Sequence, residues 1–143
     1  MTTIDATGGA AIAESLLRGI GNENWQAATR LLGEHRDGYW LRRFLTDEPA
    51  VLSGLWGSPE LITSTDADSP SIDWEVVGAK LAANAGNWPK ASSSESAILQ
   101  VAASLMGKWR VDLLRVVHVL DDAELRLVLR TLAEVGNVNT STP

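Results

Sequence analysis

Residues 92–105 read SSSESAILQVAASL and carry the strongest helix signal in this chain. Ser92 and Glu95 have the spacing of a capping box, in which each side chain accepts a hydrogen bond from the other residue's backbone N–H. From residue 96 on, apolar side chains cover almost the whole helical wheel, drawn at about 100° per residue. The polar exceptions are Ser96, Gln100 and Ser104. We therefore predict a central helix, with Leu99 and Leu105 among the most buried residues.

Similar signals continue toward the C-terminus. Asp112 can cap a short helix over LLRVVHVL, residues 113–120, although its three valines would also permit a strand, and we favour the helix. Asp121 and Glu124 form a second capping-box pair, with Asp in place of Ser or Thr. The helix that follows is expected to end at Gly136.

The last predicted helix has one apolar residue outside its apolar stripe. We expect the stripe to face the core with Leu125, Val128, Leu129 and Leu132. Leu127 then lies on the polar face, between Arg126 and Arg130. Asp122 and Glu134 belong to the same face, and mixed charges around an apolar centre suit a self-complementary two-fold contact. We accordingly predict a homodimer that forms through Leu127.

Before the central helix, apolar residues recur every three or four positions, as in amphipathic helices. The segments concerned are residues 8–21, 22–33, 37–46, 47–56 and 71–86. Residues 57–71, GSPELITSTDADSPS, lack this period, and we expect a mobile loop there and a frayed tail at 137–143. No segment alternates as a strand would. The chain therefore predicts an all-α fold, a single compact domain over residues 1–143 with six or seven short helices around one core.

A resemblance covers the last part of this pattern. The run WP-x-x-SSSE-x-A-x-L-x-x-AASL, followed by VDL, LDD and VLR, resembles the C-terminal part of small uncharacterised actinobacterial helical proteins, over residues 88–136. The chain departs from that pattern at Lys108-Trp109. The resemblance implies a bacterial helical protein, and it implies no activity and no catalytic residue.

The charge balance argues against two classes of partner. Twelve basic and eighteen acidic residues give a net charge of −6, and most of the excess lies in residues 46–90. Such a chain is repelled by phosphate backbones and anionic membranes, so nucleic-acid and membrane binding are disfavoured. A helix-turn-helix over residues 93–135 would also place Asp121, Asp122 and Glu124 against the bases.

The start of the chain and its cysteine count bear on the compartment. The N-terminal residues include no Lys or Arg before Arg18 and no long apolar block, which is not typical of a signal peptide. No run of apolar residues approaches the length of a membrane span. The chain has no cysteine, which excludes disulfides and thiolate metal sites. We expect a soluble, acidic, cytoplasmic protein.

Residues for catalysis or metal binding are sparse. The two histidines, His35 and His118, have no partner ligands at helical spacing, and we expect His118 to be packed in the apolar segment around it. Asp66 and Asp68 begin like a calcium loop, but Ser71 occupies the position that requires glycine. We find no phosphate-binding loop and no nucleophile motif. No catalytic residue, cofactor or metal is therefore predicted.

Six tryptophans are the most unusual feature of the composition. Trp25, Trp40 and Trp74 have the helical spacing of core residues. Three others stand at expected helix ends or turns and are candidates for partner binding: Trp56, Trp88 and Trp109. Three arginines close to Tyr39 and Trp40 form either a solvated helix face or an anion-binding cluster: Arg36, Arg42 and Arg43.

These observations favour a non-enzymatic helical protein that acts through protein–protein interaction, for example an inhibitor, an immunity protein or a regulatory adaptor. The alternative is a small-molecule or anion-binding pocket built from Trp, His118 and arginine side chains, with or without catalysis. Nucleic-acid binding ranks last. The identity of the protein partner does not follow from the sequence.

Overall fold

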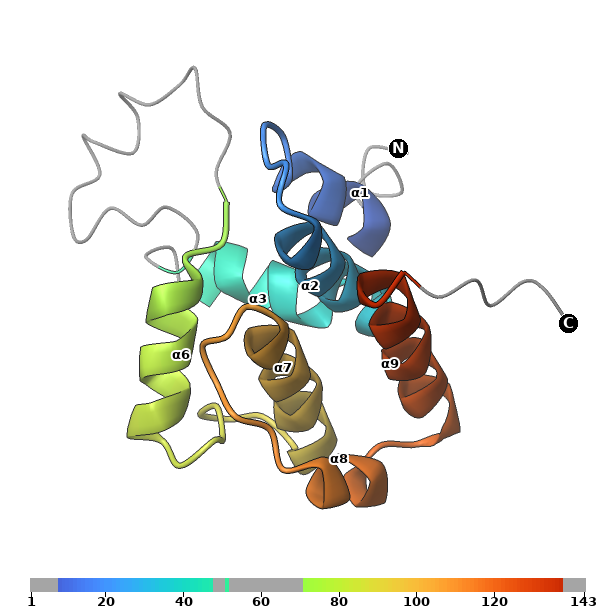
Figure 1. The fold of residues 1–143 in the computed structure, drawn as a ribbon. Coiled ribbons are helices and arrows are strands. Elements are labelled where there is room, and N and C mark those ends of the chain that lie inside the picture. Colours follow the sequence, from blue (N-terminus) through green and yellow to red (C-terminus); the bar gives the residue numbers. More distant parts are fainter. Residues whose placement is uncertain (1–7, 48–50, 52–70, 138–143) are drawn as a thin grey trace, which may run out of the picture.

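The computed structural model of the chain describes residues 8–47, 51 and 71–137. Regular secondary structure in these ranges is exclusively helical, which confirms the predicted all-α class. In chain order the α-helices are α1 (Gly9–Ser15), α2 (Glu23–Glu34), α3 (Tyr39–Asp47), α6 (Trp74–Ala83), α7 (Ser93–Leu105), α8 (Leu113–Val119) and α9 (Asp122–Val135) (Figure 1). None of the described helices combines the length and apolar character that a membrane span requires. Trp56 and nearly all of the expected mobile loop and tail lie outside the described residues.

Helix α7 occupies the centre of the described fold, between α6 and α9 and next to α2 and α8 (Figure 1). Its capping box is present: Ser92 Oγ accepts from the Glu95 N–H at 3.1 Å, and Glu95 Oε1 accepts from the Ser92 N–H at 2.8 Å. Residues 96–103 are all buried, and Leu99 is fully so. Leu105 is only half-buried, contrary to the prediction, because it stands in the last turn at the edge of the core.

Two polar residues of α7, Ser96 and Gln100, are buried and have partners. Ser96 Oγ accepts a hydrogen bond from the Trp88 backbone N–H at 3.2 Å. The Gln100 side-chain amide donates to the Gly86 carbonyl. Buried polar groups are stable only when they are hydrogen-bonded, so these two contacts attach the segment between α6 and α7 to the central helix.

An aromatic cluster fills the core between α3 and the segment that precedes α7. The ring centroids of Trp40 and Trp88 are 5.6 Å apart, and those of Phe44 and Trp88 are also 5.6 Å apart. Trp88 is 1% exposed, and the Lys80 ammonium lies over its ring at 4.7 Å. The prediction that Trp88 binds a partner is therefore wrong, because the ring is enclosed by the protein's own aromatic residues.

Most helix starts agree with the predicted caps. The side chains of Asn22, Asp112 and Asp121 accept backbone hydrogen bonds at the starts of α2, α8 and α9. The segment LLRVVHVL is helical and not a strand. One start is shifted: the helix predicted from residue 71 begins at Trp74, where the Asp73 carboxylate caps it by accepting from the N–H groups of both Glu75 and Val76.

The buried face of α9 is rotated from the predicted one: Val128 is buried and Leu125 half-buried as predicted, but the other two residues of the stripe are not. Its buried residues are Glu124, Val128 and Thr131. Leu129 is 57% and Leu132 41% exposed, whereas Leu127 is half-buried against the core. The predicted orientation of this helix is therefore wrong at three leucines. Helix α8 shows a related error: His118 is exposed and not packed, since Val116 is the residue that α8 buries.

Candidate functional site

The turn His35–Asp37 between α2 and α3 has an unusual backbone. Arg36 (φ 48°), Asp37 (φ 53°) and Gly38 (φ 83°) are consecutive left-handed residues. This conformation costs about 1–2 kcal/mol for each non-glycine residue, so surrounding contacts must hold it. Asp37 Oδ1 accepts from the Gly9 N–H at 2.8 Å, and the Asp37 carbonyl accepts from Arg42 Nε at 2.8 Å.

A close helix crossing supports this turn. A Cβ atom on Gly9 would lie 2.1 Å from the Gly33 carbonyl oxygen, and one on Gly33 would lie 2.7 Å from Ala13 Cβ. Only glycine allows α1 and the end of α2 to approach so closely. The crossing and the left-handed turn together orient His35 into the interior, where it is 2% exposed.

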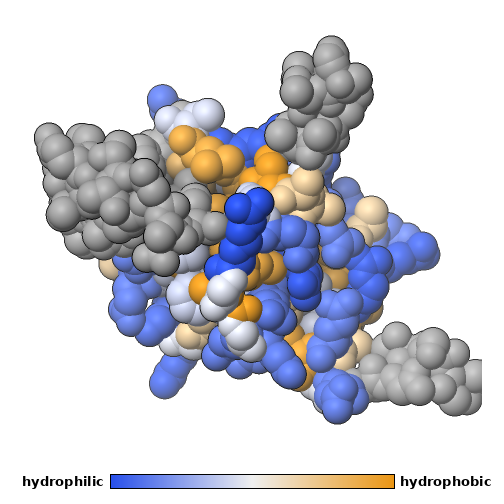
Figure 2. Space-filling model, turned by 90° about the horizontal axis from the view of Figure 1, so that it is seen from above, coloured by the Kyte–Doolittle hydropathy of each residue, from blue (hydrophilic) through white to orange (hydrophobic). Residues whose placement is uncertain are grey.

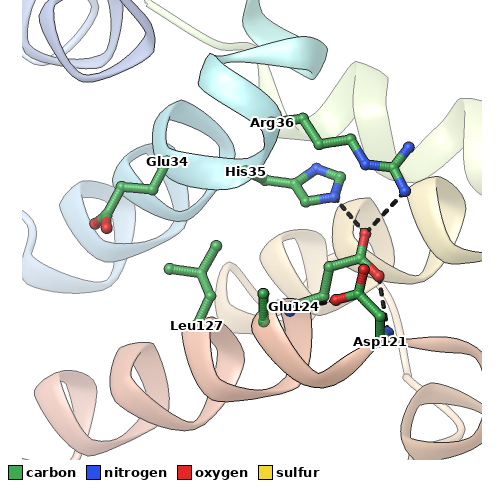
Figure 3. A pocket seen from close by; sticks show the side chains of 7 residues that line it. Glu34, His35, Arg36, Asp121, Glu124 and Leu127 are labelled. Carbon is green, nitrogen blue, oxygen red and sulfur yellow. Dashed lines mark hydrogen bonds and ion pairs between the residues drawn. The ribbon is translucent and has the colours of Figure 1, made fainter.

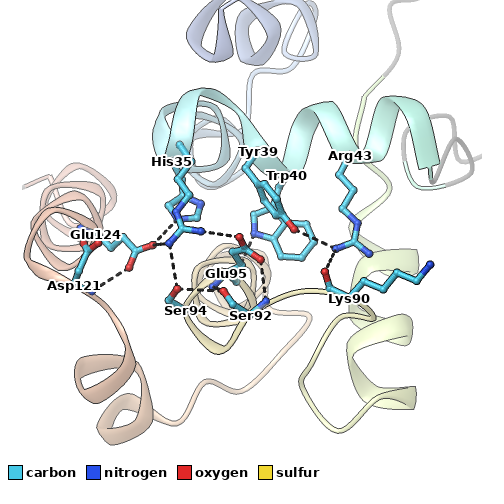
Figure 4. Close-up of polar contacts among 11 residues, drawn as sticks. His35, Tyr39, Trp40, Arg43, Lys90, Ser92, Ser94, Glu95, Asp121 and Glu124 are labelled. Carbon is cyan, nitrogen blue, oxygen red and sulfur yellow. Dashed lines mark hydrogen bonds and ion pairs between the residues drawn. The ribbon is translucent and has the colours of Figure 1, made fainter.

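Arg36 joins the starts of two helices. Glu95 and Glu124 each use Oε1 for their own capping box and leave Oε2 for other partners (Figure 4). Arg36 Nη1 lies 2.6 Å from Glu95 Oε2, and Arg36 Nη2 lies 3.3 Å from Glu124 Oε2. One guanidinium group therefore fastens the N-termini of α7 and α9 to the end of α2.

A buried hydrogen bond completes the cluster. His35 Nε2 and Glu124 Oε2 are 2.8 Å apart, and their side chains are 2% and 6% exposed (Figure 3). Burial lowers the pKa of His35 because the charged imidazolium loses its hydration, although the hydrogen bond to Glu124 acts in the opposite direction. His35 is accordingly neutral at pH 7 and donates its Nε2 proton to the carboxylate. Nδ1 is then an acceptor, and it is buried without a partner among the described residues.

A small cavity of about 180 Å³ adjoins the pair. It is lined by Glu34, His35, Arg36, Asp121, Ala123, Glu124 and Leu127 (Figure 3). The structure thus brings together Arg36 and Leu127, which the sequence assigned to an anion site and to a dimer contact. Both oxygens of Glu124 accept hydrogen bonds from the protein, which fixes the position of the carboxylate. What the cluster does is hold α9 in one orientation.

The other two arginines of the predicted anion cluster point to separate protein groups. Arg42 pairs with Asp37 at 3.2 Å. The Arg43 guanidinium lies 5.5 Å from the Trp40 ring centroid and donates to the carbonyl groups of Pro89 and Lys90, before α7; Figure 4 draws the contact with Lys90. Arg36, Arg42 and Arg43 therefore do not converge on a common ligand, because each is occupied by a different part of the fold.

Sequence reasoning missed His35 and Glu124 as interacting residues. They are separated by 89 positions, and the predicted helical wheel placed Glu124 with the capping residues, not in the core. The one available signal was the capping box itself, because its glutamate has a second oxygen that is free for a tertiary partner. Within the described ranges, no three His, Asp or Glu residues are grouped as metal ligands.

Five exposed apolar side chains lie on two helices that are consecutive in the chain. On α8, Leu113 is 66%, Leu114 65% and Val117 40% exposed, in addition to Leu129 and Leu132 of α9. Among the described residues, Leu45 of α3 is the sixth large hydrophobic residue with comparable exposure. The face opposite α8, seen from above in Figure 2, is mostly hydrophilic where it is coloured. We call the five residues of α8 and α9 the apolar surface.

Comparisons with known proteins give no relative. No protein-family model, no curated protein and no solved structure matches this chain. The resemblance of residues 88–136 to actinobacterial helical proteins therefore stays a prediction.

Proposed function

We propose that the protein acts by binding another protein through the apolar surface, Leu113, Leu114, Val117, Leu129 and Leu132. The observation that carries the proposal is that five of the six strongly exposed large hydrophobic residues in the described ranges lie on α8 and α9. Single exposed leucines are common on proteins, but several large exposed apolar residues on two consecutive helices favour an interaction surface.

The construction of α8 supports this interpretation. The helix has seven residues, and it buries Val116 on one side while Leu113, Leu114 and Val117 face outward. A helix with apolar residues on both sides is normally covered on both sides. A protein partner would cover the outer side and remove its apolar area from water. This burial stabilises a complex by about 25 cal/mol per Å² of apolar area.

The cluster of His35, Arg36 and Glu124 supports the proposal because it sets the orientation of α9. The hydrogen bond between His35 and Glu124 turns residue 124 inward, and Leu129 and Leu132 consequently face outward. Exposed charges on the same helix, Arg126 and Asp122, would form the polar rim that surrounds the apolar centre of most non-obligate interfaces. An inhibitor, immunity protein or adaptor would work through such a surface.

The proposal is tested by comparing two surface variants. Leu114→Glu places a charge in the apolar surface, and Leu45→Glu does the same to an exposed leucine of α3. Light scattering after size exclusion reports self-association, and affinity capture with mass spectrometry reports other partners. We expect wild type and Leu45→Glu to form the same complex with equal affinity. Leu114→Glu should weaken the affinity of that complex by about tenfold or more.

Two results would contradict this function. The first is a wild-type chain that is monomeric and captures nothing that Leu114→Glu fails to capture. The second is an equal loss in both variants, which would show that the effect does not come from α8. Both substitutions are at exposed positions, where stability changes are usually within about 0.5 kcal/mol, so a folding defect does not confuse the result.

A further inference from the structure

A second cavity lies where the start of α8 meets α7 and the turn after α6, and two arginines and a tryptophan line it. Its volume is about 200 Å³, and its walls come from the turn after α6, the middle of α7, the segment between α7 and α8, and the first turn of α8. The lining residues are Ala85, Gly86, Gln100, Trp109, Arg110, Asp112 and Arg115. We propose that this cavity binds a small organic monocarboxylate.

The charges of the cavity are the first argument. Five other arginines of the described part pair with carboxylates, as Arg30 does with Glu14. Arg110 makes no hydrogen bond or ion pair with any described residue, and the Arg115 side chain has one polar partner there, the neutral Asn87 Oδ1, at 3.3 Å. In a chain with a surplus of carboxylates, two arginines without an acidic partner line the same cavity, where a guanidinium group can bind a carboxylate with two parallel hydrogen bonds.

The single acidic residue of the cavity limits the charge of the ligand. Asp112 Oδ1 accepts from the Arg115 backbone N–H at 3.3 Å and so caps α8. Two guanidinium groups and one carboxylate leave one positive charge in the lining. A singly charged anion balances this charge, whereas a doubly charged one would leave an excess negative charge beside Asp112.

Trp109 supplies the aromatic surface of the cavity wall. A Cβ atom on Gly86 (φ 88°) would lie 2.9 Å from Trp109 Cζ2 and 3.2 Å from Gln100 Nε2, so the glycine brings the turn directly against the ring. Gln100 is 5% exposed and holds this turn by donating to the Gly86 carbonyl.

The size of the cavity is a further argument. Its volume of about 200 Å³ is below the range of drug-sized sites, although Trp109 and Arg110 also line a larger neighbouring hollow of about 580 Å³. Inorganic phosphate would leave much of the smaller cavity empty and would meet Asp112. A carboxylate on a small ring would place its charge between the arginines and its apolar body against Trp109.

The test is a titration of the isotope-labelled protein followed by the indole N–H signals in nitrogen–proton NMR spectra. Trp109→Phe identifies the Trp109 signal by its disappearance. The probes are benzoate, the neutral isostere benzamide and inorganic phosphate. We expect benzoate to shift the Trp109 signal saturably and to bind about tenfold or more tightly than either of the other two.

Variants locate the binding. Arg110→Gln combined with Arg115→Gln should weaken benzoate binding by about tenfold or more, because both bidentate donors are lost. Arg18→Gln is the matched control: Arg18 is exposed, likewise has no ion pair in the described part, and lies outside the cavity. Unchanged backbone signals elsewhere verify that each variant is folded.

Three outcomes would overturn the proposal. These are the absence of a saturable shift at Trp109, equal binding of benzoate and benzamide, and equal weakening by the double variant and Arg18→Gln. Phosphate binding as tight as benzoate binding would also contradict the monocarboxylate class. No protein partner is present in this experiment, so its failure is distinct from a failure of the proposed protein-binding function.

Discussion

Helices α7 and α9 both begin with a capping box, but different interactions determine which face each helix buries. Each starts with a capping box whose glutamate also contacts Arg36. Helix α7 is apolar nearly all round and is buried nearly all round, so its orientation about its own axis needed no prediction. Helix α9 is amphipathic, and its orientation is decided by Glu124 and His35. A capping box therefore predicts where a helix begins and says nothing about which face it buries.

The difference has a physical basis in the cost of buried polar groups. A wheel drawn from hydrophobicity places leucines inside and glutamate outside. Glu124 is nevertheless 5% exposed, because the Asp121 N–H, Arg36 and His35 satisfy its carboxylate. Once that residue is inside, the helix geometry turns Leu129 outward, since the two stand about 140° apart on the wheel.

The largest expected effect is at the centre of α7. Leu99→Ala should lower the free energy of unfolding by about 2–5 kcal/mol, because the side chain is fully enclosed and its loss leaves a cavity. Leu105→Ala, at the half-buried end of the same helix, should cost clearly less. Urea denaturation measures both. A loss below about 0.5 kcal/mol for Leu99→Ala would remove α7 from the centre of the fold.

Matched substitutions in the two capping boxes test what holds α9 in place. Glu95→Ala and Glu124→Ala each remove a cap and a contact with Arg36, but only Glu124→Ala also leaves His35 without its partner. We expect Glu124→Ala to lower the unfolding free energy by about 1–3 kcal/mol, more than Glu95→Ala does. Equal losses in urea denaturation would show that the cap, not the tertiary contact, holds α9.

The pH dependence of stability isolates the same contact. Burial lowers the pKa of His35 below its usual value of 6.5, so the unfolded chain binds this proton more readily than the folded chain. The contribution of His35 to the free energy of unfolding should be complete above pH 6.5. It should decrease as the pH falls below 6.5 and become constant below the folded-state pKa of His35. His35→Gln should remove this slope from urea midpoints. His118→Gln, at an exposed position, should keep it.

The smallest effect is expected on the outer face of α9. Leu129→Ala should change the unfolding free energy by less than about 0.5 kcal/mol, as is usual for exposed positions. Leu127→Ala should cost more, because Leu127 packs against the core and lines the cavity next to His35. The reverse order in thermal or urea denaturation would restore the orientation predicted from hydrophobicity. The half-buried position also makes Leu127 unsuitable for testing a dimer contact.

The predicted homodimer contact therefore moves from Leu127 to other residues of α9. The premise of the prediction was that Leu127 lies outside, and the structure places Leu129 and Leu132 there instead. If the protein partner is a second copy of this chain, Leu129→Glu should abolish the dimer seen in light scattering. Trp88, another candidate contact, is excluded by its enclosure in the aromatic core. Of the predicted partner-binding tryptophans, Trp109 is the one that borders a cavity among the described residues.

Helix starts and the central helix were readable from the residues alone. Asn22, Ser92, Asp112 and Asp121 each accept a hydrogen bond from an N–H group three positions ahead, so their role depends on a few neighbouring residues and not on the rest of the fold. The burial of α7 also followed from its composition, because a helix without a polar face has to be surrounded.

Tertiary structure alone decided the orientation of α9 and the meeting of His35 with Glu124. These residues are 89 positions apart, and no local pattern encodes their contact. The same is true of the enclosure of Trp88 and of the two arginines left without acidic partners beside Trp109. The reason is physical: a cap is satisfied within one turn of helix, whereas a buried charge or ring depends on which distant side chains arrive to satisfy or enclose it.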